Sequence, residues 1–151
     1  MDSAPFVPTI RSVGLNGLLV TFDERATDAA NRAAIAFRSA VDAQGWPEIG
    51  ESSSTLVSAF FRVDLSEYQF EPLRARLAEV LTTQDWGAAP LPVGRTLWTI
   101  PAVFGGTRAP QLAEAAEAAG LTVAQAEADL TSARLRVLTL GFAPGHPPSM
   151  K

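Results

Sequence analysis

The chain has 151 residues, of which 47% are hydrophobic and 19% are charged, and this size and composition are typical of one soluble domain. Twelve basic and 16 acidic residues give a net charge of −4, which argues against a nucleic-acid partner because such a partner requires a basic surface. Cysteine is absent, and the only lysine and the only histidine are Lys151 and His146. These counts exclude disulfides, cysteine zinc sites, multi-histidine metal sites and a P-loop lysine within the fold.

No segment approaches the roughly 20 apolar residues of a membrane span. The N-terminal sequence MDSAPFVP also lacks the basic-then-apolar order of a signal peptide. We therefore expect a cytoplasmic protein without a membrane partner.

The first elements predicted are two strands and a helix. Residues 9–15 and 18–22 flank Asn16-Gly17, a pair typical of a type I′ hairpin turn. Thr27 is the expected N-cap of a helix that ends before Gly45. We expect its buried stripe to contain Ala30, Ala33, Ala34, Phe37 and Val41, with Asn31, Arg32, Arg38 and Asp42 on the other side.

A polar break at residues 51–54 precedes a predicted strand at 55–63, which is rich in β-branched and aromatic residues. The next helix is expected to begin near Phe70 with Pro72 in its first turn, and to lead into a loop at Trp86-Gly87. We expect Trp46, Trp86 and Trp98 to pack in the core or at its rim.

The second half predicts strands at 95–104 and 135–142 with two helices between them. Pro101 indicates an edge or a bulge in the first of these strands. The first helix, 112–119, should end at Gly120, and the second should start at a capping box formed by Thr122 and Gln125.

This order of elements predicts an α+β fold. It would be a largely antiparallel sheet with helices packed on one face, a variant of the ferredoxin-like sandwich. The domain is expected to cover residues 1–143, followed by a proline-rich tail at 144–151.

Three segments carry a family resemblance. They are IRSVGLNGLLV at 10–20, IPAVFGG at 100–106 with its continuation to Thr122, and RVLTLGFAPG at 136–145. Together they resemble the N-terminal domain of a family of 5-oxoprolinase subunits, the carboxyltransferase domain, subdomain C and D, which includes allophanate hydrolase subunit 1 and sporulation kinase inhibitors.

The resemblance implies a domain that normally precedes a cyclophilin-like domain, which would begin at the tail. It also implies that the protein acts within an ATP-dependent amidohydrolase complex, with a second carboxyltransferase-like subunit as partner. A homo-oligomer is the other assembly to consider. ATP would belong to the complex, and no cofactor is expected in this chain, which alone should be inactive. The alternative is a non-catalytic regulator that binds a sensor histidine kinase.

Several polar positions of the family are changed in this sequence. Val103 stands where the family has a cysteine, Gln111 where it has an aspartate, and Leu130 where it has a histidine. The apolar and glycine positions are kept. We therefore expect a retained fold that serves as an interaction module.

The candidate site residues lie mainly near the C-terminus. His146 is a candidate general base, or alternatively a solvated residue of the tail. The last motif offers a candidate substrate or subunit interface, to which Arg136 would contribute an anion-binding side chain beside Arg134. The other residues of this interface are Gly141, Phe142, Pro144 and Gly145.

Three pairs of carboxylates are further candidates for acid/base chemistry, with solvated surface as the simpler interpretation. They are Asp23 with Glu24, Glu48 with Glu51, and Asp64 with Glu67.

Overall fold

The structure, a computed structural model, describes residues 6–64 and 69–138. Contacts divide these residues into two compact units, one formed by the residues up to Gly94 together with Leu138, and the other by Arg95–Val137. One domain over residues 1–143 stays a prediction, and the tail at 144–151 lies outside the described residues.

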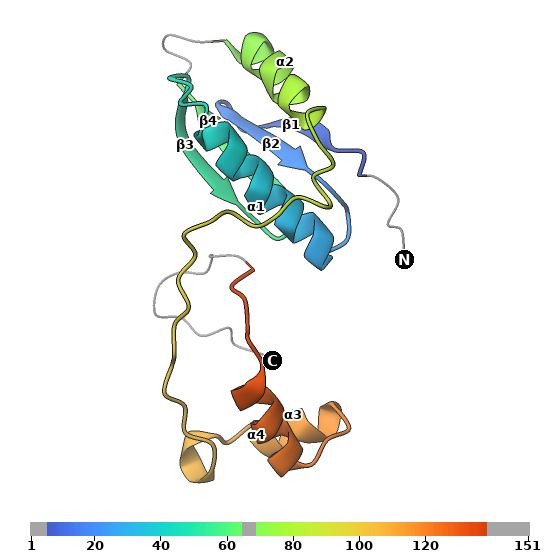
Figure 1. Ribbon diagram of the computed structural model, residues 1–151, viewed down its shortest axis with the longest axis vertical. Coiled ribbons are helices and arrows are strands. Elements are labelled where there is room, and N and C mark those ends of the chain that lie inside the picture. The colour runs from blue at the N-terminus through green and yellow to red at the C-terminus, as the bar shows by residue number, and fades with distance from the viewer. Residues whose placement is uncertain (1–5, 65–68, 139–151) are drawn as a thin grey trace. The chain divides into compact units, whose positions relative to one another are not determined.

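The first unit is a two-layer α+β sandwich, as the sequence predicted (Figure 1). Its described part holds a four-stranded antiparallel sheet in the order β1-β2-β4-β3, with two helices that contribute to one core. The chain order of strand, strand and helix occurs twice. The elements are β1 (Thr9–Val13), β2 (Gly17–Thr21), α1 (Asp28–Asp42), β3 (Ile49–Ser54), β4 (Ser58–Val63) and α2 (Phe70–Leu81).

The core lies between the helices and one face of the sheet. Alternate residues of β2 and β4 point to this face, because successive side chains of a strand point to opposite sides. Phe37 of α1 is fully buried among three aromatic rings that meet it edge-on, with centroids 5.1–6.0 Å away. The sheet contributes Leu18, Val20, Ala59, Phe61 and Val63, and the helices contribute Ala30, Ala33, Ala34, Val41, Leu73 and Leu77.

The β1–β2 hairpin is confirmed, but its loop is one residue longer than expected. Val13 pairs with Gly17, so the loop consists of residues 14–16 and Gly14 takes the positive φ of +60°. Gly17 itself lies in β2. A side chain there would collide with the ring of Phe60 on β4 and with the carbonyl oxygen of Val13, so this glycine is required by packing and not by a turn.

Helix α1 begins as predicted, because the Thr27 hydroxyl accepts a hydrogen bond from the Ala30 amide at 3.1 Å. The expectation that Asn31 is on the outer side is wrong. Asn31 is buried, and its side-chain amide donates to the carbonyl oxygens of Leu56 at 3.1 Å and Leu138 at 2.8 Å, with Thr55 at 3.4 Å. These carbonyls make a buried amide acceptable at this position.

Residues 51–54 form most of β3, whereas the sequence predicted a break there. The polar residues of β3 are compatible with an edge strand, where side chains meet solvent and neighbouring charges. Glu51 pairs with Arg62 on β4 at 2.9 Å, and Arg38 on α1 donates to the Ser52 hydroxyl at 2.9 Å. The predicted strand at 55–63 accordingly starts only at Ser58.

Helix α2 confirms the predicted start at Phe70 with Pro72 in the first turn. Leu73 and Leu77 are its fully buried residues. On another side of the helix, Arg74 donates to the Ile10 carbonyl and to the Ser12 hydroxyl, both at 2.9 Å. The guanidinium thus covers part of the free edge of β1, where backbone carbonyls would otherwise lack partners.

The second unit contains α3 (Leu112–Ala118), α4 (Val123–Ser132) and the 3₁₀ turn η1 (Gly106–Arg108). Gly120 ends the first helix region with a φ of +69°, and Thr122 and Gln125 form the predicted reciprocal capping box. The strand predicted at 95–104 is wrong, and residues 135–138 are not a strand either, while 139–142 lie outside the described residues. A strand needs a neighbour for its backbone groups, and no pairing is found for these segments within the described part of the chain.

Replacing Gly17 by alanine is expected to destabilise the first unit by about 1–3 kcal/mol. The added methyl group would meet the Phe60 ring and would lie 2.7 Å from the Val13 carbonyl oxygen. Urea unfolding followed by circular dichroism measures the change. Gly50→Ala on β3 is the matched control, because nothing lies within 4 Å of its Cβ position. Equal unfolding midpoints for the two variants would contradict the prediction.

Replacing Asn31 by aspartate keeps the side-chain shape but removes the amide donor. The carboxylate would face carbonyl oxygens in a buried position. We therefore expect the free energy of unfolding to fall by about 1–3 kcal/mol or more at neutral pH. Thermal unfolding measures this loss. Asn16→Asp in the exposed hairpin loop is the control, and a Tm for Asn31→Asp as high as that of the control would show that the buried donor is unimportant.

Candidate functional site

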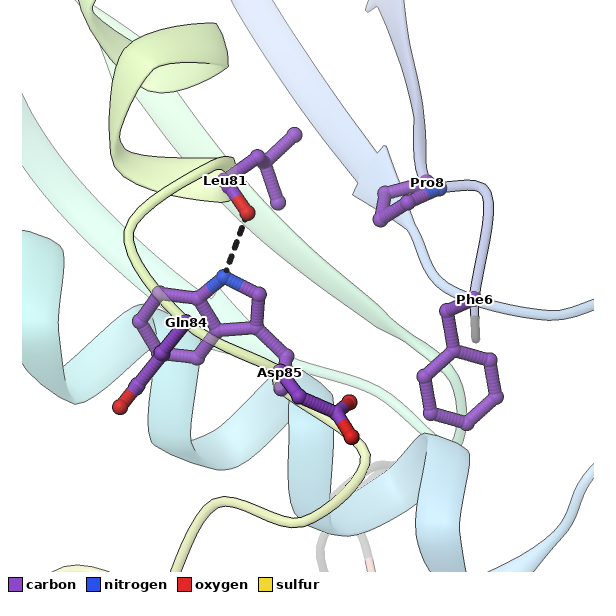
Figure 2. A pocket seen from close by; sticks show the side chains of 6 residues that line it. Phe6, Pro8, Leu81, Gln84 and Asp85 are labelled. Carbon is purple, nitrogen blue, oxygen red and sulfur yellow. Dashed lines mark hydrogen bonds between the residues drawn. The ribbon is translucent and has the colours of Figure 1, made fainter. Parts of the chain in front are cut away.

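A small pocket lies where the segment before β1 meets the loop that follows α2. Figure 2 shows Phe6 and Pro8 on one side of it and Leu81, Gln84 and Asp85 on the other. Trp86 completes the lining, and its indole N–H donates to the Leu81 carbonyl at 3.0 Å. The loop is turned by a hydrogen bond from the Gly87 amide to Asp85 Oδ1 at 2.9 Å.

The pocket has a volume of about 110 Å³, well below the roughly 300–1,000 Å³ of ordinary ligand sites. Its walls are apolar, and its polar side chains are Gln84 and Asp85. The indole N–H of Trp86 is already used within the protein. Because the lining holds a carboxylate and no cation, the pocket suits a small apolar or cationic group better than an anionic substrate.

A charged cluster joins α2 to the connection between α1 and β3. Arg76 forms an ion pair with Glu48, and its guanidinium lies over the Trp46 ring at 4.5 Å from the centroid. The Glu48 side chain is only 17% exposed. Its Oε2 atom is buried and accepts no hydrogen bond within the described part of the chain. The cluster mainly holds α2 in place, because the charges of Arg76 and Glu48 already form an ion pair with each other.

Two of the three candidate carboxylate pairs have members that are engaged in other contacts in the structure. Glu48 and Glu51 have different arginine partners, Arg76 and Arg62. Asp23 accepts a hydrogen bond from the Arg25 amide in an exposed turn. The third pair cannot be placed, because Glu67 lies outside the described residues. Among residues 6–64 and 69–138, no group of three or more acidic or histidine side chains could hold a metal ion.

Most of the candidates near the C-terminus lie outside the described residues and stay predictions. These are His146, Gly141, Phe142, Pro144 and Gly145. Arg136 is described and is partly buried. The strand that would place Arg134 and Arg136 on a common face is not formed over residues 134–138.

The second unit exposes large apolar side chains in two segments without helix or strand, residues 95–104 and 134–137, which we call the exposed apolar segments. Trp98 and Ile100 are 78% and 80% exposed, and Leu135 and Val137 are 76% and 70% exposed. Trp86 packs in the core and Trp46 beside it, as predicted, whereas the same expectation for Trp98 is wrong. Large apolar side chains left exposed are candidates for contact with another polypeptide.

Sequence reasoning missed the contacts that assemble both features of the first unit. Arg76 and Trp46 are 30 positions apart in the numbering, and Phe6 is 80 positions from Trp86. Contacts at such separations leave no local spacing signal. The strand-like pattern of the exposed apolar segments is visible in the sequence, whereas the sequence does not show that they form no strand with the other described residues.

The chain was compared with known families and structures. The sequence model of the family described as "Carboxyltransferase domain, subdomain C and D" matches residues 8–148. A solved structure, that of the conserved uncharacterized protein PH0987 from Pyrococcus horikoshii, is similar with 16% sequence identity and a TM-score of 0.46, covering 82% of this chain and 55% of that chain. The chain thus spans about half the length of that protein. The comparison with curated proteins gives no match.

In the described part of the chain, no helix combines the length and the apolar character needed to cross a membrane. The family match spans nearly all of the sequence and agrees with the motifs at 10–20, 100–106 and 136–145: the chain belongs to the family of the carboxyltransferase domain, subdomain C and D.

Proposed function

We propose that the chain is an interaction module of an ATP-dependent amidohydrolase complex of the 5-oxoprolinase or allophanate hydrolase type, inactive on its own. Family membership over residues 8–148 supports the type of complex. The observation that carries the role within it is the exposure of Trp98, Ile100, Leu135 and Val137 in the second unit. The expected partner is a second carboxyltransferase-like subunit, and ATP would be bound by the complex.

The energy available from burying the exposed apolar segments is comparable with the cost of association. Burying one large apolar side chain contributes about 1.5–3 kcal/mol. The four side chains together therefore offer about 6–12 kcal/mol, comparable with the roughly 4–15 kcal/mol that association costs in lost freedom of motion. A contact surface of this kind is expected to hold a stable complex when a few polar contacts are added.

The chemistry of the described pocket also supports a chain that does not bind the substrate by itself. 5-Oxoproline carries a carboxylate, and Asp85 at the pocket would repel it. The Trp86 N–H, which could otherwise bind an oxyanion, is held by Leu81. Substrate binding would thus depend on residues contributed by the partner or by parts of the chain outside the described residues.

The chain alone is expected to release no glutamate from 5-oxoproline and ATP, and to elute with the second carboxyltransferase-like subunit in size-exclusion chromatography. The double variant Trp98→Glu with Ile100→Glu should weaken this complex at least about tenfold, because charges would replace the apolar contact. Glutamate release and the dissociation constant of the complex are the two measurements.

The matched control is Val7→Glu with Leu15→Glu, which places two charges at equally exposed apolar positions of the first unit. Circular dichroism establishes that both double variants fold. The proposal would be wrong if the chain alone turned over substrate. It would also be wrong if the Trp98 and Ile100 double variant bound the partner subunit with an unchanged dissociation constant. A sensor histidine kinase dimerisation domain serves as second bait, and tighter binding to it would favour a regulator instead.

A further inference from the structure

The outer edge of β1 is a place where another strand could add to the sheet of the first unit. Within residues 6–64 and 69–138, β1 pairs only with β2. Successive residues of a strand direct their backbone groups to opposite edges. Because Arg74 reaches the Ile10 carbonyl from outside the β1–β2 pair, Ile10 and Ser12 are the residues whose N–H and C=O groups face the outer edge. Such an edge is a template for pairing with a second chain.

The Arg74 side chain occupies this edge. Its Nη1 donates to the Ile10 carbonyl oxygen and its Nη2 to the Ser12 hydroxyl, both at 2.9 Å. The side chain is 30% exposed, and a carboxylate oxygen of Glu71 on the same helix lies 3.5 Å from its Nε atom. The guanidinium is a rigid fork, so these contacts fix its position. An incoming strand has to place an N–H group at the Ile10 carbonyl, and this group would compete with Arg74 for the oxygen.

Arg11 disfavours one particular incoming strand, which is β1 of a second copy. Two copies of β1 can pair antiparallel about a two-fold axis at Arg11, with Ile10 opposite Ser12 of the other copy. An axis at Ile10 would put Pro8, which has no backbone N–H, into the ladder. An axis at Ser12 would place Ile10 against Gly14 in the hairpin loop. The register with all its donors therefore brings two exposed Arg11 side chains face to face, and like charges directly opposite destabilise a sheet.

We propose that Arg74, assisted by Arg11, prevents β1 from pairing with β1 of a second copy of this chain. Arg74 occupies the acceptor that the second strand needs, and Arg11 adds repulsion in the register that keeps every backbone donor. A homo-oligomer would then have to use another surface. This role is independent of the proposed function, because it concerns assembly of the chain with itself and not with a different subunit.

The test is the double variant Arg74→Met with Arg11→Thr. Methionine keeps an apolar stem on α2 but has no guanidinium, and threonine is a β-branched residue without charge. Analytical ultracentrifugation should show self-association at least about tenfold tighter than in the unchanged chain, since the edge hydrogen bonds of both copies become available. Amide hydrogen exchange by NMR should show protection of Ile10 and Ser12 that grows with protein concentration.

Adding Ser12→Pro to the double variant separates the β1 edge from other surfaces. Proline removes an N–H that faces the outer edge and is tolerated in edge strands, so self-association should return to that of the unchanged chain. Association through Trp98 and Ile100 would not respond to this change. Arg32→Met with Arg25→Thr is the matched control, which removes two arginines without β1 contacts and should leave self-association unchanged.

Three results would overturn the inference. They are self-association of the double variant equal to that of the unchanged chain, association that persists after Ser12→Pro, and concentration-dependent protection of Ile10 and Ser12 in the unchanged chain. Circular dichroism establishes that the variants fold. If the double variant does not, Arg74→Met alone should tighten self-association by a smaller factor, and no change would again contradict the inference. Binding to the carboxyltransferase-like subunit is measured separately, so its failure leaves this result standing.

Discussion

Burial of the Phe37 ring is the contact on which the first unit depends. The ring comes from α1 and meets Phe22 after β2, Phe61 on β4 and Trp86 in the loop after α2, with centroids 5.6, 6.0 and 5.1 Å away. Helix, sheet and loop therefore converge on one side chain, whose removal in comparable cores costs about 3–5 kcal/mol. The pocket follows from this packing, because Trp86 can line it only while Phe37 and the Leu81 carbonyl hold the indole in place.

Signals carried by neighbouring residues predict local structure well. The threonine caps of α1 and α4 are predictable because a cap needs only a hydroxyl and an amide three residues apart. The hairpin is predictable for a similar reason, but its exact loop is not. Gly17 looks like a turn residue, whereas it is needed because Phe60, distant in sequence, packs on it. Burial of Asn31 escapes prediction for the same reason, since its acceptors at Leu56 and Leu138 are set by the tertiary fold.

The first-unit features that could serve function are still less visible in the sequence. Glu48 and Glu51 lie three positions apart, which suggests a pair, but the structure gives each carboxylate its own arginine. Arg76 reaches Glu48 and Trp46 only because α2 packs near the connection between α1 and β3. No local pattern encodes such a meeting. Composition does limit the chemistry, because one histidine and no cysteine leave few routes to a metal or a nucleophile.

Disagreement between local pattern and structure is concentrated in the second unit, and this location is informative. In the first unit, strand patterns at 9–13, 17–21 and 58–63 all find partners, and the two central strands bury their apolar face. At 95–104 an equally strong pattern forms no strand with the other described residues, and most of its side chains are exposed. Propensity and burial normally agree in a foldable sequence. Where they disagree, as at Trp98 and Ile100, the side chains lack cover within the described residues, and under the proposed function a contact with another polypeptide would supply that cover.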